Sequence, residues 1–137
     1  MNVAAISGSL ISWIVLVILL LAWFGYYTFQ NYQVRQVATY LSNEEFRKGM
    51  RRAQVIDLRE KSNFKSGHIL GARSLPYSTL RSFYAQIRAD LPVYLYDQGR
   101  TVSKRAAVLL GKKGYKNIYI LKTGYQNWDG KEKKDEI

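Results

Sequence analysis

Residues 92–110 read PVYLYDQGRTVSKRAAVLL, and this stretch decides the fold. A proline precedes the large apolar residues 93–96, a run typical of a buried strand. After Thr101, apolar residues recur at i, i+4, i+7 and i+8 along one helical face: Val102, Ala106, Leu109 and Leu110. A buried strand followed by an amphipathic helix indicates a parallel sheet covered by helices. The loop between them falls at the carboxyl end of the strand, where such sheets bind ligands.

The chain from residue 41 onward alternates helix and strand signals in the same way. Ser42 followed by Glu45 forms a capping box, which predicts a helix running to about Arg52. Leu41 and Phe46 flank this start as a hydrophobic staple. We expect strands at 55–58, 72–75, 93–96 and 118–121, helices at 78–88 and 101–113, a helical turn at 125–128, and a loop through Phe64 and Gly67. The sequence therefore predicts an α/β fold with a mainly parallel central sheet flanked by helices.

The beginning of the chain has a different character. Residues 1–34 contain no Lys, Arg, Asp or Glu, and residues 10–29 are almost wholly apolar. About 20 residues at ~1.5 Å rise span the ~30 Å hydrocarbon layer of a bilayer. Aromatic residues near both ends suit the two membrane interfaces: Trp13, Trp23, Tyr26 and Tyr27. The sequence therefore predicts one N-terminal transmembrane helix at 10–29, ahead of the α/β domain.

Residues 10–29 fit a cleaved signal peptide or a buried core helix less well. A cleaved signal peptide has a basic segment before its apolar run and small residues at its cleavage site. Here no basic side chain comes first, and Trp23, Tyr26 and Tyr27 stand where small residues would be. A buried core helix would be shorter and less uniform in a domain of this size.

The basic residues set the expected topology. All 21 Lys and Arg follow the apolar run, so the positive-inside rule places the C-terminal part in the cytoplasm. We expect a single-pass protein of the cell membrane. Its expected parts are a short extracytoplasmic N-terminus (1–9), the transmembrane helix (10–29), a juxtamembrane segment continuing that helix (30–40), the domain (41–130) and a charged tail (131–137).

Two groups of motifs resemble the rhodanese-like domain family. The first is an apolar strand ending in Asp-x-Arg (55–59), then Phe64, then a Gly-His-Ile-x-Gly-Ala pattern (67–72) that runs on to Pro76. The second group comprises Ser103, 106–107, 109–110, 114–115, 118–119, 124–125 and Trp128. The resemblance covers roughly residues 41–130. It implies the rhodanese fold, and it implies that the loop after residues 93–96 is the place where family members carry a cysteine nucleophile.

The departures from the family pattern all lie in that loop. The family pattern is Cys-x-x-Gly-x-Arg-Ser; this chain has Asp97 for the cysteine, Arg100 for the glycine and Val102 for the arginine, with Gly99 one position early and Ser103 kept. The chain has no cysteine at all, and a carboxylate cannot carry a persulfide. We therefore expect no catalytic residue, and a binding loop formed by Asp97, Gln98, Gly99, Arg100, Thr101, Val102 and Ser103.

Asp97 has three candidate roles. Its carboxylate can accept hydrogen bonds from the first N–H groups of the following helix, which have no partner within the helix. Asp97 would then act as an internal counter-anion or N-cap, and this is the role we expect. Alternatively, Asp97 or Arg100 contacts a partner in an emptied pocket. The third role is that of a nucleophile, as in aspartyl-phosphate enzymes, but no metal-binding carboxylate cluster accompanies it.

His68, Asp57 and Arg59 are expected to be architectural. His68 is the single histidine, no nucleophile lies near it in the sequence, and its place matches a structural loop of the family. Asp57 and Arg59 are interpreted as a strand-end pair that ties loops together. One histidine and scattered carboxylates give no metal-ligand spacing, so we expect neither a metal nor a cofactor.

The net charge of +11 comes from 21 basic and 10 acidic residues, all after residue 34. Cations near an anionic leaflet are attracted by roughly 1 kcal/mol each. Four lie on the first expected helix of the domain: Arg47, Lys48, Arg51 and Arg52. The expected partners are the bilayer through residues 10–29, and anionic lipid headgroups or an acidic protein for the basic surface, unless that surface is merely solvated. No aromatic-basic motif accompanies the charge, so nucleic acid is not expected.

Three functions are compatible with these features. The first is a membrane-tethered, catalytically inactive rhodanese-like module that acts by binding or regulation at the cytoplasmic face. The second is a sulfurtransferase, similar to thiosulfate sulfurtransferases, that works without its own cysteine. The third is a membrane-surface scaffold with a vestigial pocket. The absence of cysteine favours the first.

Overall fold

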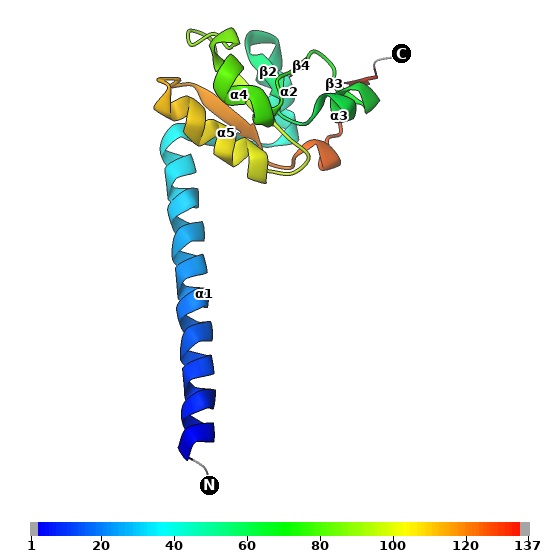
Figure 1. Ribbon diagram of the computed structural model, residues 1–137. Helices are drawn as coiled ribbons and strands as arrows, with labels where there is room; N and C mark the ends of the chain where they lie inside the picture. Colours follow the sequence, from blue (N-terminus) through cyan, green and yellow to red (C-terminus); the bar gives the residue numbers. More distant parts are fainter. Residues whose placement is uncertain (1–2, 135–137) are drawn as a thin grey trace. The chain divides into compact units, whose positions relative to one another are not determined.

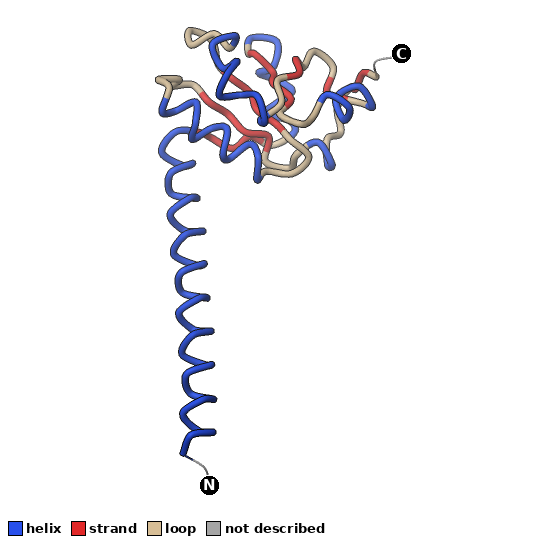
Figure 2. The backbone as a smooth tube through the Cα atoms, in the orientation of Figure 1, coloured by secondary structure: helices blue, strands red, loops and turns tan. Residues whose placement is uncertain are grey.

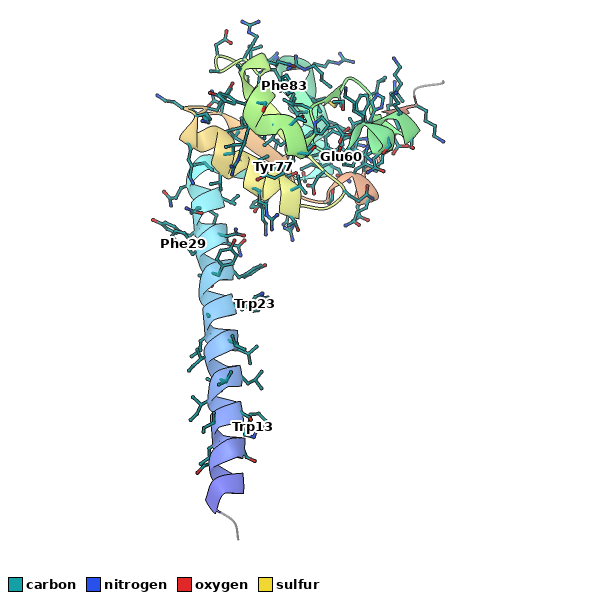
Figure 3. The ribbon with its side chains drawn as sticks, viewed as in Figure 1. Trp13, Trp23, Phe29, Glu60, Tyr77 and Phe83 are labelled. Atoms are coloured by element: carbon teal, nitrogen blue, oxygen red, sulfur yellow. The ribbon has the colours of Figure 1, made fainter. Side chains whose placement is uncertain are left out.

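The computed structural model describes residues 3–134, which divide into two compact units between Gln33 and Val34. The first unit consists of one long helix, α1 (Val3–Val37; Figure 1). The last residues of α1, from Val34 to Val37, are counted with the second unit. From Ser7 onward α1 is long and apolar enough to cross a membrane. Trp13, Trp23 and Phe29 project outward from it (Figure 3), and each is more than half exposed. The helix predicted at 10–29 is therefore present, and it begins earlier than predicted, at Val3.

The second unit is built on a five-stranded sheet in which every neighbouring pair of strands is parallel. Its strands are drawn in red among the blue helices in Figure 2. Its strands are β1 (Ala38–Leu41), β2 (Gln54–Asp57), β4 (Arg73–Ser74), β5 (Val93–Tyr96) and β6 (Ile118–Leu121). The order in the sheet is β1-β6-β5-β2-β4. The register pairs Tyr96 with Asp57, so β5 and β2 end side by side.

Helices cover both faces of this sheet, because successive strand residues alternate between two apolar clusters. One cluster joins the sheet to α4 (Tyr77–Phe83) and α5 (Thr101–Lys112); its members include Ile56, Leu80, Leu95, Ala106, Leu110 and Ile120. The other joins the opposite face to α2 (Asn43–Gly49), where the Phe46 ring lies 4.9 Å from Tyr94 and 5.6 Å from Trp128 between centroids. Single 3-10 turns follow at η1 (Met50–Arg52), η2 (Tyr84–Gln86) and η3 (Tyr125–Asn127).

The predicted fold class is confirmed, and so is the predicted start of α2. The Glu45 N–H donates to the Ser42 hydroxyl at 3.2 Å, and the Ser42 N–H donates to the Glu45 carboxylate at 3.4 Å. Leu41 and Phe46 are both buried in the same cluster, as a staple requires. The helix passes into η1 and ends at Arg52, as expected.

The juxtamembrane segment differs from the prediction at its end. Residues 30–37 continue α1 as expected, but Ala38–Leu41 form the edge strand β1, which pairs with β6. These few residues carry no strand pattern of their own. Their conformation depends on Ile118–Leu121, about 80 residues later in the chain, which the local sequence does not reveal.

Two helical regions also differ from the prediction. A short helix, α3 (Lys61–Ser66), replaces the predicted loop, and its N-cap residue makes no side-chain cap bond that would mark it in the sequence. The helix predicted at 78–88 ends as α4 at Phe83 and continues as η2.

Two residues of the predicted charged tail at 131–137 form a strand, which the sequence did not predict. β7 (Glu132–Lys133) pairs antiparallel with β3 (His68–Ile69), because backbone pairing needs no apolar side chains. Residues 135–137 lie outside the described part of the chain.

Candidate functional site

The predicted binding loop lies between the end of β5 and the first turn of α5. Asp97 follows β5 directly and is 5% exposed. β2 ends beside it, where the Leu58 N–H donates to the Tyr96 carbonyl at 3.0 Å. Of the other loop residues, Gln98, Arg100 and Thr101 are exposed, Gly99 and Val102 are half-buried, and Ser103 is buried.

The carboxylate of Asp97 points at the first turn of α5. Its two oxygens accept the Val102 and Ser103 N–H groups, each at 3.3 Å, and one of them accepts the Ser103 hydroxyl at 2.5 Å. These amides have no partner within the helix. Arg100, at the N-cap position, makes no side-chain cap bond, so Asp97 supplies the cap from within the loop. This is the geometry that the capping role predicts.

The loop backbone is held in place by the segment around η3. The Tyr125 N–H donates to the Asp97 carbonyl at 2.9 Å, and the Gln126 N–H donates to the Gln98 carbonyl at 3.2 Å. Gly124 has φ +71°, and a Cβ there would lie 2.5 Å from the Gln98 carbonyl oxygen. A glycine is therefore required at this position. The sequence analysis missed this support; its one trace in the sequence is the Gly-Tyr pair at 124–125 of the family motif.

Arg59 links the end of β2 to the segments around Gly67 and Tyr125. Its guanidinium is almost buried and donates two hydrogen bonds to the fully buried Asp57 carboxylate, from Nε at 3.1 Å and from Nη2 at 2.8 Å. Nη2 also donates to the Gly67 carbonyl at 2.6 Å, and the guanidinium carbon lies 4.1 Å from the centroid of the Tyr125 ring. Burial lowers the pKa of Arg59, but the hydrogen bond and charge of Asp57 outweigh burial and raise it. The predicted pairing of Asp57 with Arg59 is therefore present at the end of β2.

Tyr96 is fully buried at the end of β5, and its hydroxyl accepts the Ile69 N–H at 3.1 Å. Burial raises the pKa of this phenol far above its usual value, and the nearby Asp57 carboxylate raises it further. Tyr96 therefore keeps its proton to a higher pH than an exposed tyrosine does.

His68 is buried at the start of β3. Its Nδ1 lies 2.7 Å from the Phe64 carbonyl oxygen, and its ring stacks on Phe64 with 3.6 Å between centroids. These contacts fit the structural role predicted for His68. Within residues 3–134, no group of three or more metal-ligating side chains comes together.

Comparison with known proteins places this geometry in a family. The family model for the rhodanese-like domain matches residues 42–131. The chain belongs to the rhodanese-like domain family. The sequence of its rhodanese-like domain contains no cysteine, and Asp97 is the residue that directly follows β5.

Two curated proteins illustrate the range of the similarity. The chain is 46% identical to the Bacillus subtilis protein YqhL over 119 residues, which cover 86% of this chain and 94% of YqhL. The match is longer than residues 42–131, and only six residues of the sequence follow position 131. The similarity therefore also includes part of α1. The thiosulfate sulfurtransferase GlpE of Pseudomonas aeruginosa is 30% identical over 76 residues, which cover 56% of this chain and 69% of GlpE.

Solved structures support the fold. A rhodanese-related protein from Thermoplasma volcanium superposes with a TM-score of 0.65 at 20% identity, covering 69% of this chain and 97% of that one. A thiosulfate sulfurtransferase from Pseudomonas aeruginosa gives a TM-score of 0.63 at 28% identity and covers 71% of this chain, but only 20% of its own chain is matched.

Proposed function

We propose that this protein is a membrane-tethered, catalytically inactive rhodanese-like domain that acts by binding a partner at the cytoplasmic face. The observation that carries the proposal is the Asp97 carboxylate on the Val102 and Ser103 N–H groups. In this fold an anionic substrate depends on backbone donors of that loop. Here an internal anion already occupies two of them.

The chemistry of the loop supports the same conclusion. Transfer of sulfur through a persulfide needs a thiolate that attacks the donor, and the chain has no cysteine. The loop arginine expected by the family motif is Val102, so no guanidinium at that position attracts an anionic donor. The surrounding scaffold is nevertheless intact: the loop is backed by η3, and Arg59 holds Asp57. An intact scaffold whose loop N–H groups are already occupied by the Asp97 carboxylate is compatible with a binding module.

The tether is proposed on the length and composition of α1 together with the charge bias. Within residues 3–134 one helix could cross a membrane; of the 21 basic residues, Arg35 lies in its last turn and the other 20 follow it. By the positive-inside rule the domain then faces the cytoplasm. A reporter that is active only in the cytoplasm, fused after Ile137, should be active; digestion of the domain by protease added to intact cells would contradict this topology.

A working sulfurtransferase is the second candidate, because part of the chain is 30% identical to a thiosulfate sulfurtransferase. That function requires a thiol from a partner, since this chain supplies none. A scaffold with a vestigial pocket is the third.

The test is sulfur transfer from thiosulfate to cyanide by the purified full-length protein in detergent, beside an active thiosulfate sulfurtransferase. We expect no thiocyanate above the buffer rate. Turnover that survives purification and disappears in Asp97→Ala would overturn the proposal. Turnover that appears only when a thiol protein is added would favour the second candidate.

A further inference from the structure

A pocket of about 340 Å³ lies away from the Asp97 loop. Its walls come from α2 and η1, from the turn after β3, and from the segment between η3 and β7: Arg47, Met50, Arg51, Leu70, Trp128 and Lys131. Apolar side chains and three cations thus surround one small hollow. None of these lining residues belongs to the loop at 97–103, so the proposed role of Asp97 does not account for the pocket.

Leu70 is held outward at this pocket by the local backbone. It is 45% exposed, and in the described part of the second unit only Phe83 is another large exposed apolar side chain. The turn is fixed by Gly71 at φ +92° and by the Ala72 N–H, which donates to the Ile69 carbonyl at 2.9 Å. The Leu70 N–H donates to the Lys131 carbonyl at 3.0 Å. Leu70 is therefore a fixed apolar contact point.

Trp128 provides a second fixed apolar surface. Its ring meets Phe46 edge to face at 5.6 Å, and its indole N–H donates to the Lys131 carbonyl at 3.3 Å. Both contacts set the ring orientation before any ligand arrives. Rigid aromatic and aliphatic side chains of this kind act as anchors for a partner, because little side-chain entropy is lost on binding.

The cations of the pocket are available to different degrees. Arg47 pairs with Asp129 at 3.0 Å. Arg51 and Lys131 are exposed, and within residues 3–134 neither forms an ion pair. Two unpaired cations beside apolar walls complement an anionic ligand with an apolar side chain.

We infer that this pocket docks an acidic segment of a partner protein, which inserts one apolar side chain between Leu70 and Trp128 and places carboxylates at Arg51 and Lys131. The inference deepens the proposed function, on which it rests, by naming the class of partner. A peptide fits better than a lipid surface, because a hollow of about 340 Å³ between fixed side chains accepts one protruding side chain. A flat array of headgroups needs no such hollow.

The test uses the full chain in nanodiscs of neutral phosphatidylcholine, with ¹⁵N-labelled tryptophan. The probe is a blocked peptide with a central leucine and two acidic residues on each side. Its control carries glycine in place of leucine and has the same charge. We expect the leucine peptide to shift the Trp128 indole resonance saturably, with Trp13 and Trp23 unmoved. The glycine peptide should bind about tenfold more weakly.

Matched variants locate the site. Leu70→Asp and Arg51→Glu should each weaken binding by about tenfold. Phe83→Asp on α4, labelled in Figure 3, and Arg105→Glu on α5 introduce the same changes elsewhere and should leave binding intact. All four positions are exposed, so the variants should fold, which far-UV circular dichroism checks.

Three results would overturn the inference. The first is the absence of a saturable Trp128 shift up to millimolar peptide. The second is equal binding of the leucine and glycine peptides, or binding that Leu70→Asp does not change. Either result would mean that electrostatic attraction alone explains the affinity, without an inserted apolar side chain. The third is a Trp128 shift produced without peptide by anionic phosphatidylglycerol nanodiscs and abolished by Arg51→Glu, which makes the headgroup the occupant. Sulfur-transfer activity is measured separately, so its appearance would sink the proposed function without affecting the peptide result.

Discussion

Replacing Asp97 by alanine removes the cap of α5 and tests the basis of the proposed function. The carboxylate accepts two helix N–H groups and the Ser103 hydroxyl. Losing an N-cap costs about 0.5–2 kcal/mol, and a buried hydroxyl left without its partner costs about 1–3 kcal/mol. Because Ser103 is fully buried, both effects apply, and we expect a loss of about 2–3 kcal/mol in the free energy of unfolding.

The measurement is urea unfolding in mild detergent, followed by Trp128 fluorescence. Trp13→Phe and Trp23→Phe in the background leave Trp128 as the reporter from the domain. Asp97→Asn is the matched control, because asparagine caps helices about as well as aspartate, and it should cost less than alanine. In a double-mutant cycle, Ser103→Ala should lower the free energy of unfolding less in the Asp97→Ala background than in the wild type. Equal unfolding midpoints for wild type and Asp97→Ala would refute the capping argument.

Three further predictions follow from the site. Asp97→Cys should fold and react with an alkylating reagent, yet remain a poor sulfurtransferase until Val102→Arg is added; full turnover by the single variant in the thiosulfate assay would contradict this. Arg59→Ala should lower the free energy of unfolding by about 3–5 kcal/mol, because it leaves the buried Asp57 charge unpaired; in urea titrations a loss under about 1 kcal/mol would show that the pair is not needed. Burial raises the pKa of Tyr96, so its contribution is fully present below the unfolded tyrosine value of about 10 and is lost as pH rises above it towards the folded pKa. Alkaline denaturation should therefore steepen above about pH 10, and Tyr96→Phe should reduce that steepness; an unchanged profile would exclude Tyr96 as the cause.

The parts of the fold that the sequence could predict are those with strong local signals. β5 and β6 match the predicted runs 93–96 and 118–121, because each is a short block of large apolar residues buried on both faces. The start of α2 could be predicted because its capping box and staple are chemical contacts between near neighbours. The capping geometry of Asp97 belongs to the same class, since it depends on residues within one turn of the following helix.

The missed parts depend on contacts that are distant in the chain. β1 and β7 are strands because β6 and β3 lie beside them, and their own residues carry no period-2 pattern. Gly124 supports the loop through a close backbone approach that no local pattern encodes. The pocket around Leu70 collects side chains from three separate segments, so it exists only in the folded chain.

The pairing of β1 with β6 also sets the order of events during synthesis. Ala38–Leu41 leave the ribosome before any other strand, yet their hydrogen-bonding partner is made about 80 residues later. At roughly 5–20 residues per second, that interval lasts about 4–16 s. The neighbours β2, β4 and β5 can assemble first, whereas the strand that directly follows α1 must wait for the last segment of the sheet to be translated. The earliest strand of this domain to be made is thus among the last to be paired.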